Sequence, residues 1–163
     1  MEKVLVTGAT GYIALHCVQQ LLDQGYAVNG SIRSPERKNE VIEALKNSGT
    51  STENLNLFVF DLTNDEGWDD GMEGCDYLLH VASPLALENH TEDYFVKPAV
   101  AGAKRALKFA KKHGVKKVVL TSSVAAIFET GEEKVFYDES DWSDPDNPNI
   151  SNYAKSKTLA EKA

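Results

Sequence analysis

Short apolar runs alternate along the chain with longer segments in which apolar residues recur at helical spacing. The apolar runs lie at 4–7, 26–32, 55–60, 76–82 and 115–122. Each run has the length of a buried strand, and a segment with helical periodicity follows each of them. Strands that alternate with helices are typical of a parallel sheet with helices on both faces, so we expect the α/β class.

The segments between the runs predict five helices and several of their ends. We expect helices from 13 to Gly25, from Pro35 to about 46, near 64–71, from about 91 to 113, and from Ser151 to the end of the chain. Gly25 should follow its helix in a left-handed backbone conformation. Ser34 and Ser151 are expected as caps, with Pro35 as a first helical residue. The segment 123–149 is rich in Asp, Pro and Asn and should be a loop.

The connectivity predicts how the strands lie in the sheet. Right-handed crossovers and two mononucleotide-binding halves favour a Rossmann-type, doubly wound sheet in the order 3-2-1-4-5. A ligand of such a sheet lies beyond the carboxyl ends of the strands, where the order reverses. Here that place is between the first and fourth strands, directly after residue 7.

Composition and charge narrow the classes of function. The 163 residues are 42% hydrophobic and predict one domain, 1–163. A formal net charge of −8 argues against nucleic acid as a partner, and no apolar run is long enough to cross a membrane. Cys17 and Cys75 are isolated, as in reduced cytoplasmic proteins, and the four histidines are scattered. We therefore expect a cytoplasmic protein without a metal site.

The turn after the first apolar run has the residues of a phosphate site. Its sequence is Thr7-Gly8-Ala9-Thr10-Gly11-Tyr12-Ile13-Ala14, with the spacing GxxGxxA. Gly8 would allow a tight turn, and Gly11 would allow a pyrophosphate to approach the backbone closely. The small side chain of Ala14 would allow the helix to pack closely on the strand. Free N–H groups and the positive end of a helix dipole would then face one point. Glycine turns also join strands to helices without any ligand, so the turn by itself leaves that alternative open.

The end of the second apolar run favours NADP(H) over NAD. Sites for NAD usually place an acidic residue on the ribose 2′-hydroxyl about 20 residues after the glycines. The run Asn29–Arg33 contains no acid. Arg33, with Lys38 nearby, would instead pair with a 2′-phosphate. The alternative is that Arg33 is an ordinary solvated turn residue.

A second constellation lies near the end of the chain. Ser123 follows the fifth apolar run, and Tyr153 and Lys157 are i and i+4 on one expected helix. An ammonium beside a phenol stabilises the phenolate, and such a phenol can exchange a proton with a carbonyl or alcohol. A serine hydroxyl can hold the same oxygen. Tyr-x-x-x-Lys also arises by chance on helix surfaces, but the three residues behind a dinucleotide turn favour catalysis.

These segments together resemble the extended short-chain dehydrogenase/reductases, of the epimerase/dehydratase type, and within them the dihydroflavonol-reductase-like branch. The resemblance spans the chain and corresponds to the N-terminal portion of that family. It lies in TGATGYIA, FDLTN, HVASP, LTSSVAA, YDESDWSD and YAKSKTLAEKA. It implies that Tyr153 is the acid in carbonyl reduction, that Lys157 tunes it and holds the nicotinamide ribose, and that Ser123 orients the substrate oxygen.

The resemblance also implies which residues contact the dinucleotide. Asp61 and Leu62 would face the adenine, and Val81, Ala82 and Ser83 would line the nicotinamide and its ribose. The remaining cofactor contacts would come from Thr7, Gly8, Thr10, Gly11, Tyr12, Ile13, Arg33, Lys38, Thr121, Tyr153 and Lys157.

Members of the extended family continue for about as many residues again, and that half covers the substrate. We therefore expect this chain to be a truncated form that binds the cofactor with little turnover, and it leaves the small carbonyl substrate unnamed. An exposed sheet edge beside the fifth strand favours a homo-oligomer. Two alternatives remain: a nucleotide-sugar epimerase or dehydratase with bound NAD, and a non-catalytic dinucleotide-sensing module.

Overall fold

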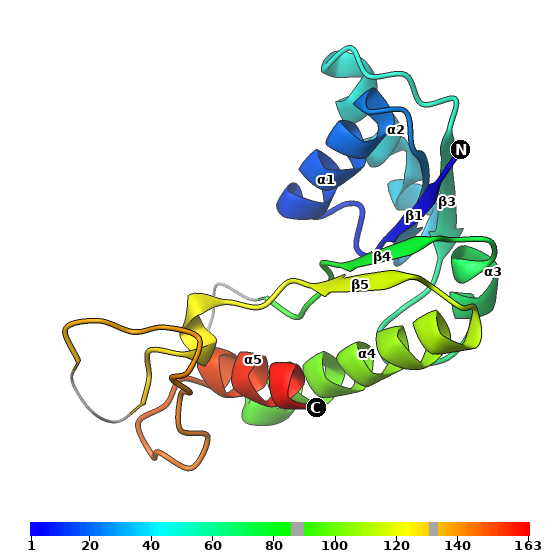
Figure 1. Ribbon diagram of the computed structural model, residues 1–163. Helices are drawn as coiled ribbons and strands as arrows, with labels where there is room; N and C mark the ends of the chain where they lie inside the picture. The colour runs from blue at the N-terminus through cyan, green and yellow to red at the C-terminus, as the bar shows by residue number, and fades with distance from the viewer. Residues whose placement is uncertain (86–89, 131–133) are drawn as a thin grey trace. The chain divides into compact units, whose positions relative to one another are not determined.

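The computed structural model describes residues 1–85, 90–130 and 134–163 (Figure 1). Its strands are β1 (Lys3–Val6), β2 (Ala27–Ile32), β3 (Leu55–Val59), β4 (Tyr77–His80) and β5 (Lys117–Leu120). Its α-helices are α1 (Tyr12–Asp23), α2 (Lys38–Asn47), α3 (Trp68–Met72), α4 (Glu92–Lys112) and α5 (Asn152–Lys162). Two 3₁₀ turns, η1 (Pro35–Arg37) and η2 (Val124–Ala126), complete the elements.

The five strands form one parallel sheet in the order β3-β2-β1-β4-β5. This is the order that the alternation of strands and helices predicts. The register sets Val6 of β1 between Gly30 of β2 and Leu79 of β4. The carboxyl ends of the two central strands therefore lie side by side, directly before the glycine turn.

The chain divides into two compact units. The first comprises Met1–Ala82 with Arg105–Thr121, and the second comprises Ser83–Lys104 with Ser122–Ala163. The first unit holds the whole sheet with α1, α2, α3 and the last part of α4. The second holds the first part of α4, with η2 and α5.

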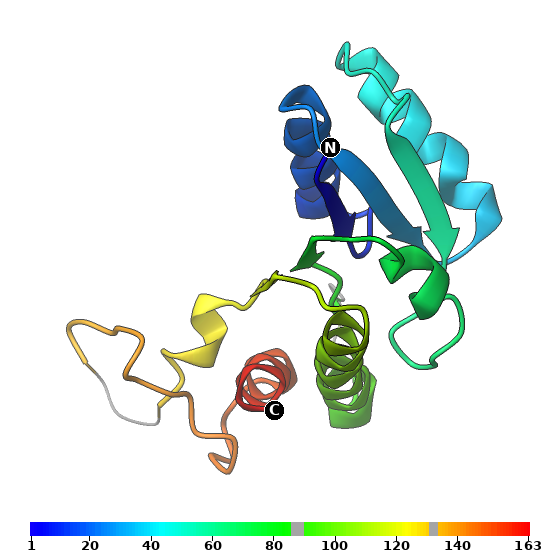
Figure 2. The ribbon, with the colours of Figure 1, turned by 45° about the vertical axis from the view of Figure 1, so that its right-hand side comes forward.

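In the first unit, α1 and α2 cover one face of the sheet (Figure 2). Ala14 and Val18 of α1 pack with Val4 of β1 and Val28 of β2, which are paired across the two strands; all four residues are almost fully buried. The small side chain of Ala14 is 1% exposed, which agrees with the close helix–strand packing that the sequence predicts.

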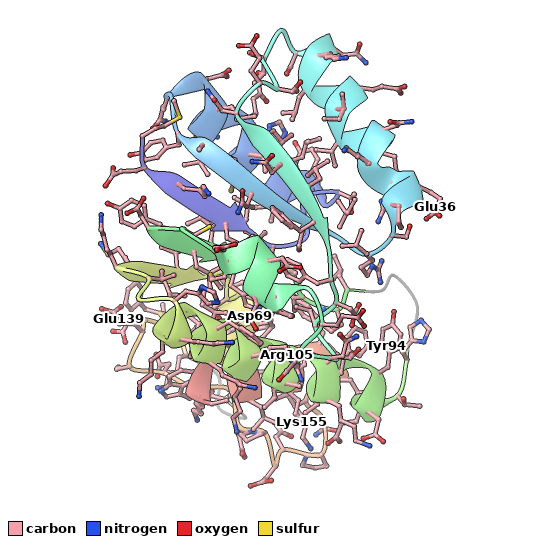
Figure 3. The ribbon with its side chains drawn as sticks, turned by 90° about the vertical axis from the view of Figure 1, so that its right-hand side faces the viewer. Glu36, Asp69, Tyr94, Arg105, Glu139 and Lys155 are labelled. Atoms are coloured by element: carbon pink, nitrogen blue, oxygen red, sulfur yellow. The ribbon has the colours of Figure 1, made fainter. Side chains whose placement is uncertain are left out.

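The opposite face of the sheet is covered by α3 and the last part of α4. Trp68 is completely buried there, between Phe60 at 4.6 Å and Phe109 at 5.8 Å, measured between ring centroids. Figure 3 labels Asp69 of α3 and Arg105 of α4, which lie at the solvent edge of this layer. Asp69 pairs with Lys112, and Arg105 pairs with Asp65. These exposed ion pairs add little stability compared with the aromatic core beneath them.

Several predicted helix ends are confirmed. Gly25 follows α1 with φ +86°, and Ser151 caps α5 by accepting the Ala154 N–H. The helix expected from Pro35 begins instead as the 3₁₀ turn η1, and the side chain of Ser34, at its N-cap, accepts no capping hydrogen bond from a backbone N–H. The helix expected near 64–71 is shorter, because Gly67 has φ +78°, a conformation that no helix contains.

The segment 123–149 is not wholly a loop, since η2 occupies its beginning; residues 131–133 lie outside the described part of the chain. Among the described residues, none of the helices combines the length and apolar composition needed to cross a bilayer. In the same ranges, no three His, Cys, Asp or Glu side chains gather as metal ligands would.

Candidate functional site

The glycine turn joins β1 to α1 and is bound to the end of β2. Gly8 has φ +72°, as its expected place in a tight turn requires. Its N–H donates to Ser31 Oγ at 2.8 Å, and the Ala9 N–H donates to the Ser31 carbonyl at 2.8 Å. Ser31 therefore orients the turn, a role that its sequence position gives no sign of, because the contact spans 23 residues.

The turn leaves space that a side chain would fill. A Cβ on Gly8 would lie 3.1 Å from the Cβ of Ala82, at the end of β4. Gly11 is the N-cap of α1 and has no capping side chain, while Tyr12 and Ile13 are exposed. The first N–H groups of α1 are thus not covered by a cap, and the positive end of the helix dipole is open to an anion.

Thr7 joins the ends of β1 and β4 from inside the fold. Its hydroxyl oxygen accepts the N–H groups of Val81 and Ala82, each at 3.0 Å, and lies 3.0 Å from Nδ1 of His80. The residue is completely buried. Its side chain therefore supports the segment Val81–Ala82 and is not itself directed at solvent.

Three cations follow the end of β2. Arg33 is exposed, and no hydrogen bond or ion pair of its side chain is found within the described ranges. Lys38 is exposed at the start of α2. Arg37, which the sequence did not single out, lies between them, but its guanidinium is held by Glu40 at 2.8 and 3.0 Å. Arg33 and Lys38 are therefore more available to a phosphate than Arg37.

Asp61 and Leu62 follow β3 in a tight turn. The Asp61 carboxylate accepts the N–H and the hydroxyl of Thr63 at 2.8 and 2.6 Å, and the Asp61 carbonyl accepts Trp68 Nε1 at 2.9 Å. The Leu62 carbonyl accepts a bond from Arg105. These contacts hold the turn after β3 in place.

The candidate residues divide between the two units. The first unit contains the candidate residues of the glycine turn, those at the ends of β2, β3 and β4, and Thr121. The second unit contains Ser83 and the candidate catalytic residues Ser123, Tyr153 and Lys157. Within the first unit, the structure brings Thr7, Gly8, Val81 and Ala82 into contact.

Lys157 lies against Tyr153, as their i, i+4 spacing on α5 predicts. Its Nζ is 5.8 Å from the centroid of the Tyr153 ring. The lysine is only 6% exposed, and burial lowers the pKa of its ammonium, an effect that the nearby Glu161 carboxylate partly offsets. The Phe95 ring packs against the Tyr153 ring in a T-shaped arrangement, with 6.4 Å between the centroids and an interplanar angle of 81°.

The two adjacent serines after β5 have different partners. Ser122 donates its hydroxyl to the Glu161 carboxylate. Ser123 is the N-cap of η2, and its Oγ accepts the Ala125 N–H at 3.2 Å. Capping uses the oxygen of Ser123 as an acceptor and leaves its O–H to donate elsewhere. This difference favours Ser123 over Ser122 as a donor to a substrate oxygen.

The comparison with protein families agrees with this arrangement. Residues 4–163 match the NAD dependent epimerase/dehydratase family. The chain belongs to this family. The match includes both the glycine turn and the helix with Tyr153 and Lys157, and it confirms the family that the sequence segments resemble.

Relatives of the chain include named plant reductases. Vestitone reductase of Medicago sativa is 41% identical, over 99% of this chain and 52% of its own length. Dihydroflavonol 4-reductase of Solanum lycopersicum is 36% identical, over 98% of this chain and 44% of its own length. The chain thus spans about half the length of the curated relatives it matches.

Solved structures share the fold. Yeast methylglyoxal/isovaleraldehyde reductase Gre2, complexed with NADPH, matches 98% of this chain and 51% of its own with a TM-score of 0.83 and 32% identity. Vestitone reductase from alfalfa matches 99% of this chain and 51% of its own with a TM-score of 0.82 and 38% identity. The Rossmann-type fold predicted from the sequence is therefore confirmed.

Proposed function

We propose that this chain is the dinucleotide-binding part of an NADP(H)-dependent reductase that converts an aldehyde, ketone or dihydroflavonol-like carbonyl to an alcohol. The observation that carries the proposal is the buried ammonium of Lys157 against the ring of Tyr153, one helical turn apart. An ammonium in this position can stabilise the phenolate that is left when Tyr153 transfers its proton, because opposite charges attract more strongly away from water. The named relatives, which are carbonyl reductases, support the same class of reaction.

Each residue of this set then has a role in proton transfer. Tyr153 donates its phenolic proton to the carbonyl oxygen as that oxygen becomes an alkoxide. Lys157 stabilises the phenolate that remains and holds the nicotinamide ribose. Ser123 donates its O–H to the same carbonyl oxygen and orients it.

The turn after β1 fits a dinucleotide. The absence of a Cβ on Gly8 leaves the backbone open beside Ala82, and α1 begins without a capping side chain. Thr10, Gly11, Tyr12 and Ile13 would hold the pyrophosphate through this turn. When bound, NADPH supplies the hydride, from C4 of its nicotinamide.

The other cofactor contacts follow the strand ends. Arg33 and Lys38 would hold the 2′-phosphate, and Asp61 and Leu62 the adenine. The remaining contacts, with the nicotinamide and its ribose, would come from Val81, Ala82, Ser83 and Thr121, and from Thr7 through its backbone. NAD is the second choice, since the run Asn29–Arg33 contains no acid.

We further propose that residues 1–163 act as one NAD(P)-binding domain, and that a polypeptide of these residues alone binds NADPH with little turnover. The curated relatives are about twice as long, and water that enters the site of such a polypeptide would weaken the electrostatic stabilisation of the transition state. The same proposal includes three further statements: the substrate is a small carbonyl compound, the protein is cytoplasmic, and it forms a homo-oligomer.

The test is a titration with NADPH and NADH, followed by a turnover assay. Wild type should bind NADPH more tightly than NADH, and Arg33→Ala should lose most of that preference. Lys111→Ala, which removes an exposed cation at the end of α4, is the matched control and should keep it. Equal affinity of wild type for both cofactors would refute the choice of NADP(H).

Turnover distinguishes the remaining alternatives. Methylglyoxal, isovaleraldehyde, vestitone and a dihydroflavonol are suitable probes, because reductases of such compounds are relatives. Slow reduction that Tyr153→Phe abolishes supports the reductase. Tightly retained NAD with activity on a nucleotide sugar would favour an epimerase or dehydratase, and NADPH binding without any turnover would favour a sensing module. Fast reduction by the 163-residue chain would refute the part of the proposal that concerns turnover.

A further inference from the structure

A series of hydrogen bonds crosses the segment between η2 and α5, within the second unit. It begins at Ser123, whose Oγ accepts the Ala125 N–H at 3.2 Å and whose carbonyl accepts the Ala126 N–H at 2.9 Å. Both alanines are buried, and η2 packs against α5. The carbonyls of the two alanines both accept hydrogen bonds from one residue, Ser143.

Ser143 is completely buried and makes three bonds. Its Oγ donates to the Ala125 carbonyl at 2.8 Å, and its N–H donates to the Ala126 carbonyl at 2.8 Å. The same Oγ accepts the Glu129 N–H at 2.8 Å. A buried hydroxyl used as both donor and acceptor has one orientation, so Ser143 fixes η2 and Glu129 relative to each other.

Glu129 continues the series to the start of α5. Its carboxylate accepts the Ser151 N–H at 2.8 Å and the Ser151 hydroxyl at 2.9 Å. Ser151 Oγ in turn accepts the Ala154 N–H at 3.1 Å, which caps the helix. Both bonds to the carboxylate are charge-assisted, and a negative charge at a helix N-terminus is favourable. Tyr153 lies within this first turn.

We propose that Glu129 and Ser143 are positioning residues that fix Ser123 relative to Tyr153. We refer to them, with their bonds, as the Ser143–Glu129 strap. The proposal rests on the proposed function, which requires the serine hydroxyl and the phenol to meet at one carbonyl oxygen. Ser123 and Tyr153 are 30 positions apart in the sequence, and a stretch of that length without cross-links allows many separations of its ends. The strap removes that freedom, because it joins both ends of the segment through buried or charge-assisted bonds.

The experiment measures amide hydrogen exchange in the 163-residue chain by NMR, without cofactor. The Ala154 N–H reports the start of α5, and the Ala125 N–H reports the bond to Ser123. In Glu129→Gln one acceptor oxygen and the charge are lost at nearly constant size. We expect exchange at both amides to become about tenfold faster, the effect of losing one charge-assisted hydrogen bond. Ser143→Cys should accelerate the same two amides, because sulfur is a weak acceptor and donor.

Glu139→Gln is the matched control. Glu139 is an exposed glutamate of the same segment, labelled in Figure 3, and its carboxylate has no contact among the residues described. The control should leave both amides unchanged. Faster exchange at Ala154 alone in Glu129→Gln would overturn the proposal, since Glu129 would then be only a helix cap. Equal exchange in Glu129→Gln and Glu139→Gln would overturn it as well.

A second readout is the rate at which the chain reduces isovaleraldehyde with NADPH, measured as kcat and as the KM for NADPH. Glu129→Gln should lower kcat about tenfold and leave the KM for NADPH unchanged, because the hydrogen bonds that define the strap all join residues of the segment between Ser123 and α5. An unchanged kcat in a variant with faster exchange would overturn the positioning role. If wild type neither binds NADPH nor turns over, the proposed function fails by itself. The exchange rates at Ala125 and Ala154 then decide whether the strap joins the two ends.

Discussion

Lys157 shows how much the surroundings of a single residue change its chemistry. A lysine on a helix near the end of a chain is ordinarily solvated, yet this one is 6% exposed. Burial disfavours its charged form, and the carboxylate of Glu161, one turn further along α5, favours it. The ammonium beside Tyr153 is therefore maintained by a nearby carboxylate that the motif Tyr-x-x-x-Lys does not include.

This balance gives a prediction for Glu161. In Glu161→Gln the pKa of Lys157 should fall further, because the favourable charge is removed while burial stays. The measurement is an NMR titration of the lysine side chain with pH, with Glu139→Gln as the control. A Lys157 pKa that is equal in wild type and Glu161→Gln would contradict the role assigned to Glu161.

Cys75 gives a prediction about stability at high pH. The thiol is 5% exposed, and burial raises its pKa from 9.0 to about 11. Between these values the thiol ionises in the unfolded chain and stays protonated in the folded one, so ionisation stabilises the unfolded state. Ionisation of this thiol should therefore lower the unfolding free energy of wild type by about 2 to 3 kcal/mol between roughly pH 9 and pH 11.

Cys75→Ala isolates that loss. The other groups that titrate in this pH range are the same in wild type and in Cys75→Ala. The difference between the unfolding free energies of the two proteins should therefore narrow as the pH rises through this range. Urea unfolding at several pH values measures it. A difference that is constant between these pH values would show that the thiol is not the source.

At the scale of elements, glycines decide where helices begin and end, and two of them can be compared directly. Gly25 and Gly67 both have positive φ, +86° and +78°. Around Gly25 there is nothing within 4 Å of an added Cβ, whereas at Gly67 that atom would lie 2.5 Å from the Val59 carbonyl oxygen. Alanine at position 25 would therefore carry only the conformational penalty of a positive φ. Alanine at position 67 would carry the same penalty and, in addition, a clash with the backbone of β3.

We therefore expect Gly67→Ala to destabilise the protein more than Gly25→Ala. The conformational penalty alone is about 1 kcal/mol, and overpacking against backbone adds about 1 to 3 kcal/mol. Urea unfolding of the two variants measures the difference, with Gly25→Ala as the matched control. Equal unfolding free energies would mean that α3 moves away from the end of β3 at little cost.

Most elements of this fold could be predicted, because their signals are local. Short apolar runs mark the strands, and helical spacing such as Ile13, Cys17 and Leu21 marks α1. The exceptions have local causes as well. The chain from Pro35 forms a 3₁₀ turn before α2 begins, as is common at helix N-termini, and the positive φ of Gly67 delays the start of α3. Neither effect is visible in the periodicity of apolar residues alone.

At the scale of the whole molecule, the proposed NADPH site predicts ligand-dependent stability. A ligand that binds only the folded state at about 100 times its Kd adds about 2.7 kcal/mol. For a chain of this size we expect the melting temperature to rise by about 5 to 10 °C with NADPH, and by less with NADH at the same concentration. Differential scanning fluorimetry measures both shifts.

Arg33→Ala should make the two shifts similar, because it removes the cation proposed for the 2′-phosphate. An equal shift with NADPH and NADH in wild type would contradict the proposed preference. No shift with either cofactor would contradict dinucleotide binding by the chain as a whole.

The sequence by itself determined the helices and strands of this protein, the order of its strands and its glycine turn. It also determined that Tyr153 and Lys157 share one face of a helix. These depend on residues a few positions apart or on the general handedness of crossovers. The tertiary structure alone decided which groups support them. It placed the Thr7 hydroxyl on Val81 and Ala82, and it joined Glu129 to Ser151. Such partners are separated by 22 to 75 residues, and only the folded path of the chain brings their atoms within hydrogen-bond distance.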